Sequence, residues 1–204
     1  HGIRAATGEY ILTLDADDWF APTFVEKAVD VLERRNDVGA ATCWMQMFGR
    51  FDRIRRTQGG ELQDFLVSNC CTASCLLRRA CWERVGGYDE TMKEGYEDWD
   101  FWISVCENGW TIHSIPEALF HYQTAAGSMV MGSDRKRPEL VRQLVRNHRE
   151  SYRAHVEHVL YEKEKLIQEI EQDRDAVRGR FSHRLGRLLV HPWETLRRKL
   201  QTPD

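Results

Sequence analysis

The spacing of hydrophobic and polar residues along this chain changes character near residue 134. Before that point, short apolar runs alternate with stretches in which apolar residues recur every three or four positions, a pattern typical of alternating strands and helices. It predicts strands over 10–15, 38–48, 72–77, 111–115 and 118–123, helices over 22–36, 62–67, 78–85 and 98–107, and loops over 49–60 and 127–134. After that point charged residues dominate and the apolar ones keep a helical spacing. We therefore expect an α/β domain over residues 1–134, followed by helices.

The first predicted strand ends in three carboxylates within four residues, Asp15, Asp17 and Asp18. Its continuous apolar run after Gly8 is typical of a buried parallel strand, and ligands bind beyond the carboxyl ends of such strands. Three like charges repel one another, and a divalent cation with oxygen ligands removes that cost. The pattern therefore indicates a Mg²⁺ or Mn²⁺ site. The alternative is that these acids only precede the helix that Pro22 begins.

Residues 135–177 have the pattern of one long helix. Residues at alternating spacings of three and four form one row along this helix, and Lys163 and Asp173 occupy two of its positions. The apolar members of the row are Tyr152, Val156, Val159, Leu166, Ile170 and Val177. A partial heptad surrounded by charge predicts an exposed helix or a weak coiled coil. Self-association through this helix, and hence a homo-oligomer, stays open.

Residues 178–204 form a third segment with its own charge. Positions 178–199 hold seven basic residues and one acid, interleaved with Leu residues and Trp193. A basic amphipathic helix of this kind suits an anionic membrane surface. Packing of the tail against the preceding domain is an equal alternative.

The charge distribution and the cysteines indicate the cellular compartment of the protein. Residues 1–134 hold 12 Lys and Arg against 21 Asp and Glu (−9), whereas residues 135–199 hold 17 against 10 (+7). No apolar run approaches the ~20 residues that span a bilayer. The six cysteines lack metal-ligand spacing and favour a reduced compartment, so we expect a cytoplasmic protein, with attachment to the membrane periphery left open. We expect no nucleic-acid partner.

Three motifs together resemble family-2 glycosyltransferases of the glycosyltransferase-A fold. They read A-x-G-E-Y-I-x-x-L-D-A-D-D over residues 6–18, V-G-G-Y-D-E over 85–90 and E-D-W-D-F over 97–101. The resemblance covers roughly residues 3–130. It implies a partial glycosyltransferase-A-like mixed sheet with flanking helices, ahead of the long helical C-terminal tail. It also implies inverting, metal-dependent transfer from a nucleotide-diphosphate sugar to a glycan, lipid-linked or protein acceptor.

The resemblance also implies roles for particular residues. Asp15 and Asp17 match the acids that hold the nucleotide and the metal, Mn²⁺ or Mg²⁺. Asp98 matches the base that takes the proton of the acceptor hydroxyl, with Glu97 beside it. Arg78, in the Arg78–Arg79 pair, resembles a basic strand-end position that faces substrate.

One part of the family pattern is altered here. Where members carry an arginine and a histidine before a serine-rich loop, this chain has Gln123, and the nearest histidine is His121. His121 is therefore a weaker candidate metal ligand than the two aspartates.

The start of the chain shapes the remaining alternatives. Only 14 residues precede Asp15, whereas the family's strands for the nucleotide base and ribose come some 60–80 residues before those acids. We therefore expect the chain to be the later part of a longer enzyme, and whether it is active alone stays open. One alternative is an acceptor-binding or oligomerisation module that complements a separate nucleotide-binding part. Another is a nucleotidyltransferase, which also uses paired acids at strand ends.

Overall fold

A computed structural model describes residues 2–124 and 136–199 of the chain, with side chains described as far as residue 177. It divides into two compact units, His1–Val159 and Leu160–Asp204. The loop predicted over 127–134, and the side chains on which the predicted basic tail depends, lie outside the described residues.

The helices and strands have the following bounds. The helices are α1 (Gly2–Ala5), α2 (Phe24–Arg34), α3 (Leu62–Val67), α4 (Arg79–Val85), α5 (Glu97–Glu107), α7 (Arg137–Asn147), α8 (Arg149–Ala154) and α9 (Val156–Lys199). The strands are β1 (Tyr10–Leu12), β2 (Trp19–Phe20), β3 (Val38–Gly49), β4 (Arg53–Arg55), β5 (Gly59–Gly60), β6 (Leu76–Arg78) and β7 (Thr111–Thr124).

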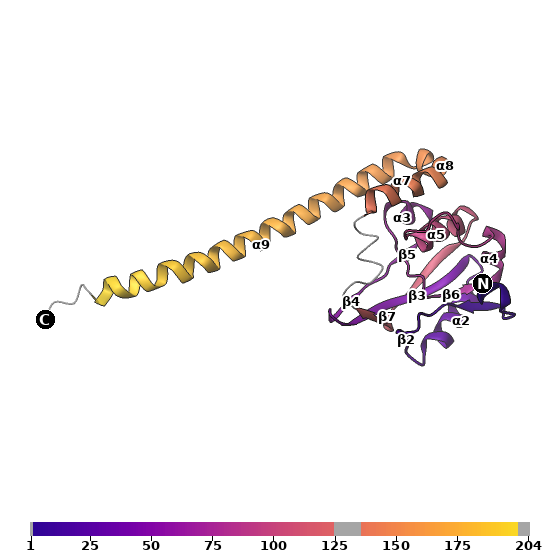
Figure 1. Cartoon of the computed structure of the whole chain (residues 1–204), viewed down its shortest axis with the longest axis horizontal. Coiled ribbons are helices and arrows are strands. Elements are labelled where there is room, and N and C mark those ends of the chain that lie inside the picture. The colour runs from indigo at the N-terminus through magenta and orange to yellow at the C-terminus, as the bar shows by residue number, and fades with distance from the viewer. Residues whose placement is uncertain (1, 125–135, 200–204) are drawn as a thin grey trace. The chain divides into compact units, whose positions relative to one another are not determined.

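The seven strands form one mixed sheet with helices on both faces (Figure 1). The strand order is β1-β6-β3-β7-β2, with β4 added beside β3 and β5 beside β7. Among the described pairings, β3 and β7 run parallel and the other neighbours antiparallel. The predicted mixed sheet with flanking helices is therefore confirmed.

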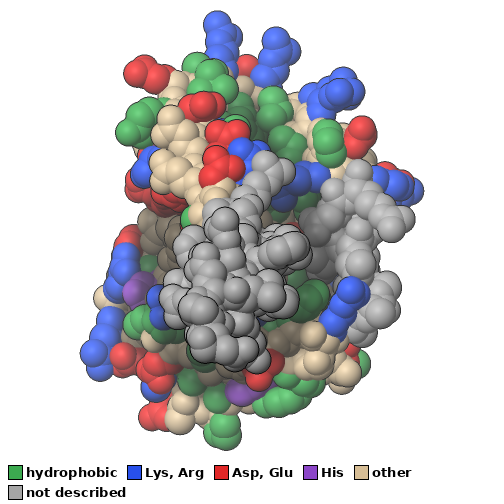
Figure 2. All heavy atoms as spheres, turned by 90° about the vertical axis from the view of Figure 1, so that its left-hand side faces the viewer, with side chains coloured by type: hydrophobic (Ala, Val, Ile, Leu, Met, Phe, Trp, Pro, Cys, Tyr) green, Lys and Arg blue, Asp and Glu red, His purple; other side chains and the backbone are tan. Residues whose placement is uncertain are grey.

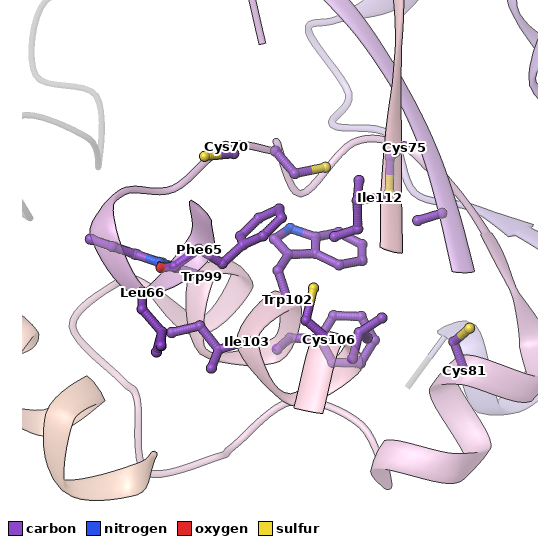
Figure 3. Packing of buried hydrophobic residues seen from close by; sticks show 14 of the residues in the cluster. Phe65, Leu66, Cys70, Cys75, Cys81, Trp99, Trp102, Ile103, Cys106 and Ile112 are labelled. Carbon is purple, nitrogen blue, oxygen red and sulfur yellow. The ribbon is translucent and has the colours of Figure 1, made fainter. Parts of the chain in front are cut away.

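Each face of the sheet carries its own hydrophobic core. On one face, α2 buries Phe24, Ala28 and Leu32, which recur every four residues along its inner side. On the other face, α3, α4 and α5 pack around a cluster that includes Trp99 and Trp102 (Figure 3). Both tryptophans are buried. On the face that Figure 2 shows, acidic and basic side chains are interspersed.

The strand before the three aspartates is shorter than predicted and differently paired. β1 ends at Leu12, and its partner among the described residues is β6, which runs antiparallel to it. Leu12 and Leu14 are 36% and 47% exposed. The prediction of a buried parallel strand is therefore wrong, because a short apolar run does not reveal which strand it will pair with.

β7 is one continuous strand where the sequence predicted two. Along β3, Cys43 pairs with Ile115 and the next residue, Trp44, pairs with Ala118, so Pro116 and Glu117 bulge out of the ladder. Proline lacks an N–H group and is tolerated in a sheet at such a bulge. The strand therefore passes through Pro116 instead of ending there.

The loop predicted over 49–60 contains two short strands, β4 and β5. β4 pairs with β3, and the two glycines of β5 pair with His113 and Ile112 of β7. At Gly59 φ is 64°, and a Cβ atom would lie 2.4 Å from the Ile112 carbonyl oxygen. Only glycine fits so close to the backbone of β7, which is why this strand carries no hydrophobic signal.

All six cysteines are buried and unpaired, as their apolar surroundings indicated. Burial raises the pKa of the Cys43 thiol to about 12. At neutral pH this thiol is therefore protonated and packs as a small hydrophobic group.

A buried ionic network holds α7 and α8 against α5. The His148 ring lies 3.1 Å from Asp100 Oδ1 on one side and 3.1 Å from Glu107 Oε2 on the other. Asn147 Nδ2 also donates to Asp100 Oδ1, at 2.7 Å. Desolvation alone would lower the pKa of His148, but the hydrogen bonds and charges of the two carboxylates raise it to about 9. His148 is therefore a cation at neutral pH.

Because of this packing, the first unit extends beyond residue 134, where the sequence predicted the end of the α/β domain. Leu140, Leu144 and Val159 are buried in the same unit as the sheet. Val159 and Tyr152, two members of the predicted coiled-coil row, contribute to that core. None of the helices, over the residues that the structure describes, is long and apolar enough to cross a membrane.

His148→Gln should destabilise the protein by about 3 kcal/mol at pH 6, because the change removes the cation between two carboxylates that are partly or fully buried. The pKa of His148 is higher in the folded state (about 9) than its ordinary value of 6.5. Its stabilisation is therefore fully present below pH 6.5 and is lost as the pH rises through 9. Urea denaturation of both proteins between pH 6 and 9.5 measures the difference.

His155→Gln is the control, since His155 contacts a backbone carbonyl, that of Ser151. A gap between wild type and His148→Gln that stays constant up to pH 9.5 would show that His148 is neutral in the folded protein.

Candidate active site

The three strand-end acids lie in the loop between β1 and β2. The Thr13 hydroxyl donates to the Ala73 carbonyl at 2.6 Å and ties this loop to the segment before β6. Asp15 and Asp17 are exposed, whereas Asp18 is buried. Asp18 Oδ1 accepts a hydrogen bond from the Gln123 backbone N–H at 2.8 Å, but its Oδ2 is buried without a partner. Burial raises the pKa of Asp18, and the charges of Asp17 and Asp15 add to the rise.

This loop suits a divalent cation that also binds substrate oxygens. Over the residues whose side chains are described, no group of three or more His, Cys, Asp or Glu is arranged to hold a metal ion. Mg²⁺ and similar cations, however, commonly take one or two carboxylates and complete their shell with phosphate oxygens and water. Two exposed aspartates and an unsatisfied third carboxylate provide such a partial set.

Asp98 sits at the N-terminal end of α5. The preceding Tyr96 has φ 64°, an uncommon conformation for a residue with a side chain, so the backbone turns sharply into this helix. Asp98 Oδ1 accepts from the Trp99 N–H at 2.7 Å, and Oδ2 accepts from Asn69 Nδ2 at 3.0 Å. Each carboxylate oxygen keeps a further lone pair for a ligand.

The surroundings of Asp98 make it a stronger base than an ordinary aspartate. Burial, together with the neighbouring charge of Glu97, raises the pKa of Asp98 to about 6, although the hydrogen bond from Asn69 acts in the opposite direction. A carboxylate with this pKa is ionised at pH 7 and can still take up a proton. The structure thus gives Asp98 a suitable environment for a base and gives Glu97 a tuning role.

The charge of Arg55 acts on both Tyr122 and Asp98. Burial raises the pKa of Tyr122, the charges of Asp18, Asp15 and Asp17 raise it further, and that of Arg55 lowers it. The same Arg55 charge lowers the pKa of Asp98. Charge effects of this kind fade within about 10 Å in salt solution, so the two sets of carboxylates belong to one neighbourhood.

Arg78 has a different position from the one that the resemblance implied. On β6, Arg78 pairs with Tyr10, whereas Leu76 pairs with Leu12, so Arg78 lies at the end of β6 away from the acids. Its guanidinium donates to the carbonyls of Val38, Leu32 and Arg35. These bonds satisfy carbonyls at the C-terminal end of α2, and we leave Arg78 out of the site.

His121 lies beside the acid loop but faces a tryptophan. It is paired with Trp19 across β2 and β7, and the two rings stack with centroids 4.9 Å apart. Successive side chains on a strand point to opposite faces, so His121 points away from the side of its neighbour Tyr122. This arrangement favours Asp15 and Asp17 over His121 as metal ligands.

The sequence did not assign three residues of this neighbourhood to the site. Asn69 and Arg55 occupy segments without periodic pattern, and Tyr122 sits one position from the histidine that the resemblance singled out. Each reaches the site through tertiary contacts, as in the hydrogen bond from Arg55 Nη2 to the Asn69 carbonyl at 3.3 Å.

Residues 1–97 match the model of the family described as "Glycosyl transferase family 2". A Bacillus subtilis protein named "Putative glycosyltransferase EpsE" is 26% identical over 125 residues, which cover 59% of this chain and 45% of that protein. A Methanocaldococcus jannaschii protein named "Uncharacterized glycosyltransferase MJ1057" is 25% identical over 129 residues, covering 59% of this chain and 44% of the other. The chain thus spans less than half the length of these two relatives.

Solved structures agree on the fold. The crystal structure of S. aureus TarS 1-349 in complex with UDP-GlcNAc superposes with a TM-score of 0.56 and 14% identity, over 71% of this chain and 44% of that one. A second TarS structure gives a TM-score of 0.52 and 15% identity, over 70% of this chain and 25% of that one. The glycosyltransferase-A-like fold is thereby confirmed. Over residues 1–97, just under half of its length, the chain is similar to glycosyl transferase family 2.

Proposed function

We propose that the protein transfers a sugar from a nucleotide diphosphate to an acceptor hydroxyl, with inversion at the sugar carbon. The carrying observation is the environment of Asp98: a carboxylate at a helix N-terminus, held by Asn69, with a pKa of about 6. The family match and the UDP-GlcNAc complex of the TarS neighbour support a nucleotide-sugar donor.

In this mechanism Asp98 acts on the acceptor. Its carboxylate takes the hydroxyl proton as the acceptor oxygen forms a bond to the sugar carbon. The bond from that carbon to the diphosphate breaks on the opposite face, and its electron pair leaves with the diphosphate. Asn69 keeps the carboxylate oriented, and Glu97 helps to keep its pKa high.

Asp15 and Asp17 would hold Mn²⁺ or Mg²⁺ together with the donor diphosphate. When bound, the cation neutralises negative charge on the departing diphosphate. Asp18 fixes the loop to β7 through the Gln123 N–H, so the two exposed carboxylates are presented from a defined position. The reported relatives are named as glycosyltransferases, so we set the nucleotidyltransferase alternative aside.

A second candidate function is self-association through α9. Leu160, Ile167, Ile170 and Val177 are exposed and recur at spacings of seven, three and seven residues, which places them along one side of the helix. Ile170 is 67% exposed. This row replaces the predicted one, since Tyr152 and Val159 pack in the core. It supports an oligomerisation role and a homo-oligomer.

The basic sequence of residues 178–199 supports two further proposals. One is that the protein binds at the membrane periphery, and the other is that a lipid-linked acceptor reaches it along the membrane surface. The choice among glycan, lipid-linked and protein acceptors depends on groups that recognise the acceptor.

Asp17→Ala should abolish the effect of Mn²⁺ on donor binding, because it removes one of the two exposed carboxylates. Calorimetric titration of the protein with UDP-GlcNAc, with and without Mn²⁺, measures the effect. Asp30→Ala is a matched control, an exposed aspartate on α2 that pairs with Arg34. Tighter donor binding with Mn²⁺ in Asp17→Ala would remove Asp17 from the metal site.

Asp98→Asn should lower turnover by ~10²–10⁴ and leave donor affinity near that of wild type, since general-base catalysis contributes about that much. In wild type, turnover should fall as the pH drops below about 6, where Asp98 becomes protonated. The measurements are kcat against pH and donor affinity. Weaker donor binding with unchanged kcat would make Asp98 a binding residue instead.

Replacing Ile167 and Ile170 by Asp should convert an oligomer into a monomer, because two buried charges destroy an apolar helix interface. Analytical ultracentrifugation measures the mass. Glu164→Gln with Gln168→Glu, at exposed polar positions of the same helix, is the control. An interface with a Kd at or below ~10 μM would be largely occupied at a protein concentration of ~100 μM. A wild-type protein that is still monomeric at ~100 μM would therefore contradict this role.

A further inference from the structure

β4 and the residues before and after it form an exposed basic edge beside the candidate active site. We call residues 50–56 the arginine edge. They hold four arginines and one acid (+3), whereas the other residues of 1–134 hold 8 Lys and Arg against 20 Asp and Glu (−12). A concentrated positive segment in an acidic domain indicates a partner with negative charge.

The arginines of this edge are supported by aromatic rings. The guanidinium groups of Arg50 and Arg53 lie 5.4 and 5.7 Å from the centre of the Phe51 ring, and that of Arg56 lies 5.0 Å from the Trp44 ring. Stacking on a ring orients a guanidinium without neutralising its charge.

Carboxylates do little to neutralise three of the four arginines of this edge, Arg53, Arg55 and Arg56. Among residues with described side chains, Arg53, Arg55 and Arg56 make no ion pair. The acid within the edge, Asp52, accepts a hydrogen bond from the Gln46 side chain at 2.8 Å. All three residues of β4 are exposed, and so is Phe51, at 49%.

The edge is connected to both halves of the site. Arg55 donates to the Asn69 carbonyl at 3.3 Å, and Asn69 donates to Asp98 at 3.0 Å. On the sheet, Met47 of β3 pairs with Arg53 on one side and with Tyr122 on the other. A ligand lying along β4 would therefore end next to the base.

We propose that the arginine edge binds phosphate groups of an anionic glycan acceptor and leads one of its hydroxyls to Asp98. This inference rests on the proposed function. The carboxylates of the site repel such an acceptor, so a cationic path is needed to bring it close. Guanidinium groups match the geometry of phosphate oxygens, and the exposed Phe51 ring offers an apolar surface for the face of a sugar.

The test is direct binding of a labelled linear polyphosphate of ~10 units, chosen to cover four arginines, by fluorescence anisotropy at 50–200 mM salt. The protein is used without donor or metal. Arg53→Gln with Arg56→Gln should weaken binding about tenfold or more at the lowest salt. It should also reduce the slope of log K against log salt by about two, one for each arginine that is replaced. Arg4→Gln with Arg34→Gln makes the same charge change on exposed residues elsewhere and should leave binding unchanged.

Several outcomes would overturn the proposal. The proposal is wrong if both double variants bind polyphosphate equally well, or if wild type does not bind it at 50 mM salt. The arginines would then serve only to keep an edge strand from pairing with another chain. Displacement of polyphosphate by UDP would assign the edge to the donor diphosphate. Tighter binding of an oligoribonucleotide with the same number of phosphates would make the partner a nucleic acid. Because binding is measured without transfer, a failure of the proposed reaction and a failure of this inference are distinguishable.

Discussion

The parallel pairing of β3 with β7 is the constraint on which the rest of the first unit depends. It runs from Val38 and Thr111 to Gly49 and Thr124 and separates the two hydrophobic cores. β6 and β4 attach along the outer side of β3, while β2 and β5 attach to β7. Because both flanks are fixed to one ladder, the acid loop next to β2 and the arginines of β4 are held on a common frame.

Differences in burial divide the chemical tasks among acids of the same type. Asp15 and Asp17 stand in water, where an ionised carboxylate costs little and a cation can reach it. Asp98 lies where burial raises its pKa to about 6, so it can exchange a proton near neutral pH. Asp100, two residues further along α5, is neutralised by His148 and serves packing instead. The helix that carries the proposed base is thus anchored by an acid other than that base.

The charges of the surface fit this division. A site rich in carboxylates is suited to a metal and to proton transfer, but it repels an anionic substrate. The arginine edge of residues 50–56 places positive charge next to that site, with Trp44 and Phe51 orienting three of its guanidinium groups. In the proposed function, attraction of the acceptor and the chemistry are therefore assigned to neighbouring but separate segments of the chain.

The similarity to glycosyl transferase family 2, the mixed sheet and most helices could be predicted from the sequence because they depend on local signals. The periodic apolar face of α2 is one such signal, and the breaker at Gly86 and Gly87 is another: both glycines have positive φ, and a Cβ atom at Gly87 would meet the Trp82 ring at 2.8 Å. The motifs that pointed to Asp15, Asp17 and Asp98 are local for the same reason.

Pairing partners and long-range contacts were decided by the tertiary structure. Four features join segments that are distant in sequence. They are the antiparallel pairing of β1 with β6, the passage of β7 along β3 through Pro116, the capping of α2 by Arg78 and the hydrogen bond from Asn69 to Asp98. A residue's type and spacing determine which side of a helix or strand it occupies. Which neighbour it meets there, and therefore its pKa and its hydrogen bonds, depends on the packing of the whole sheet.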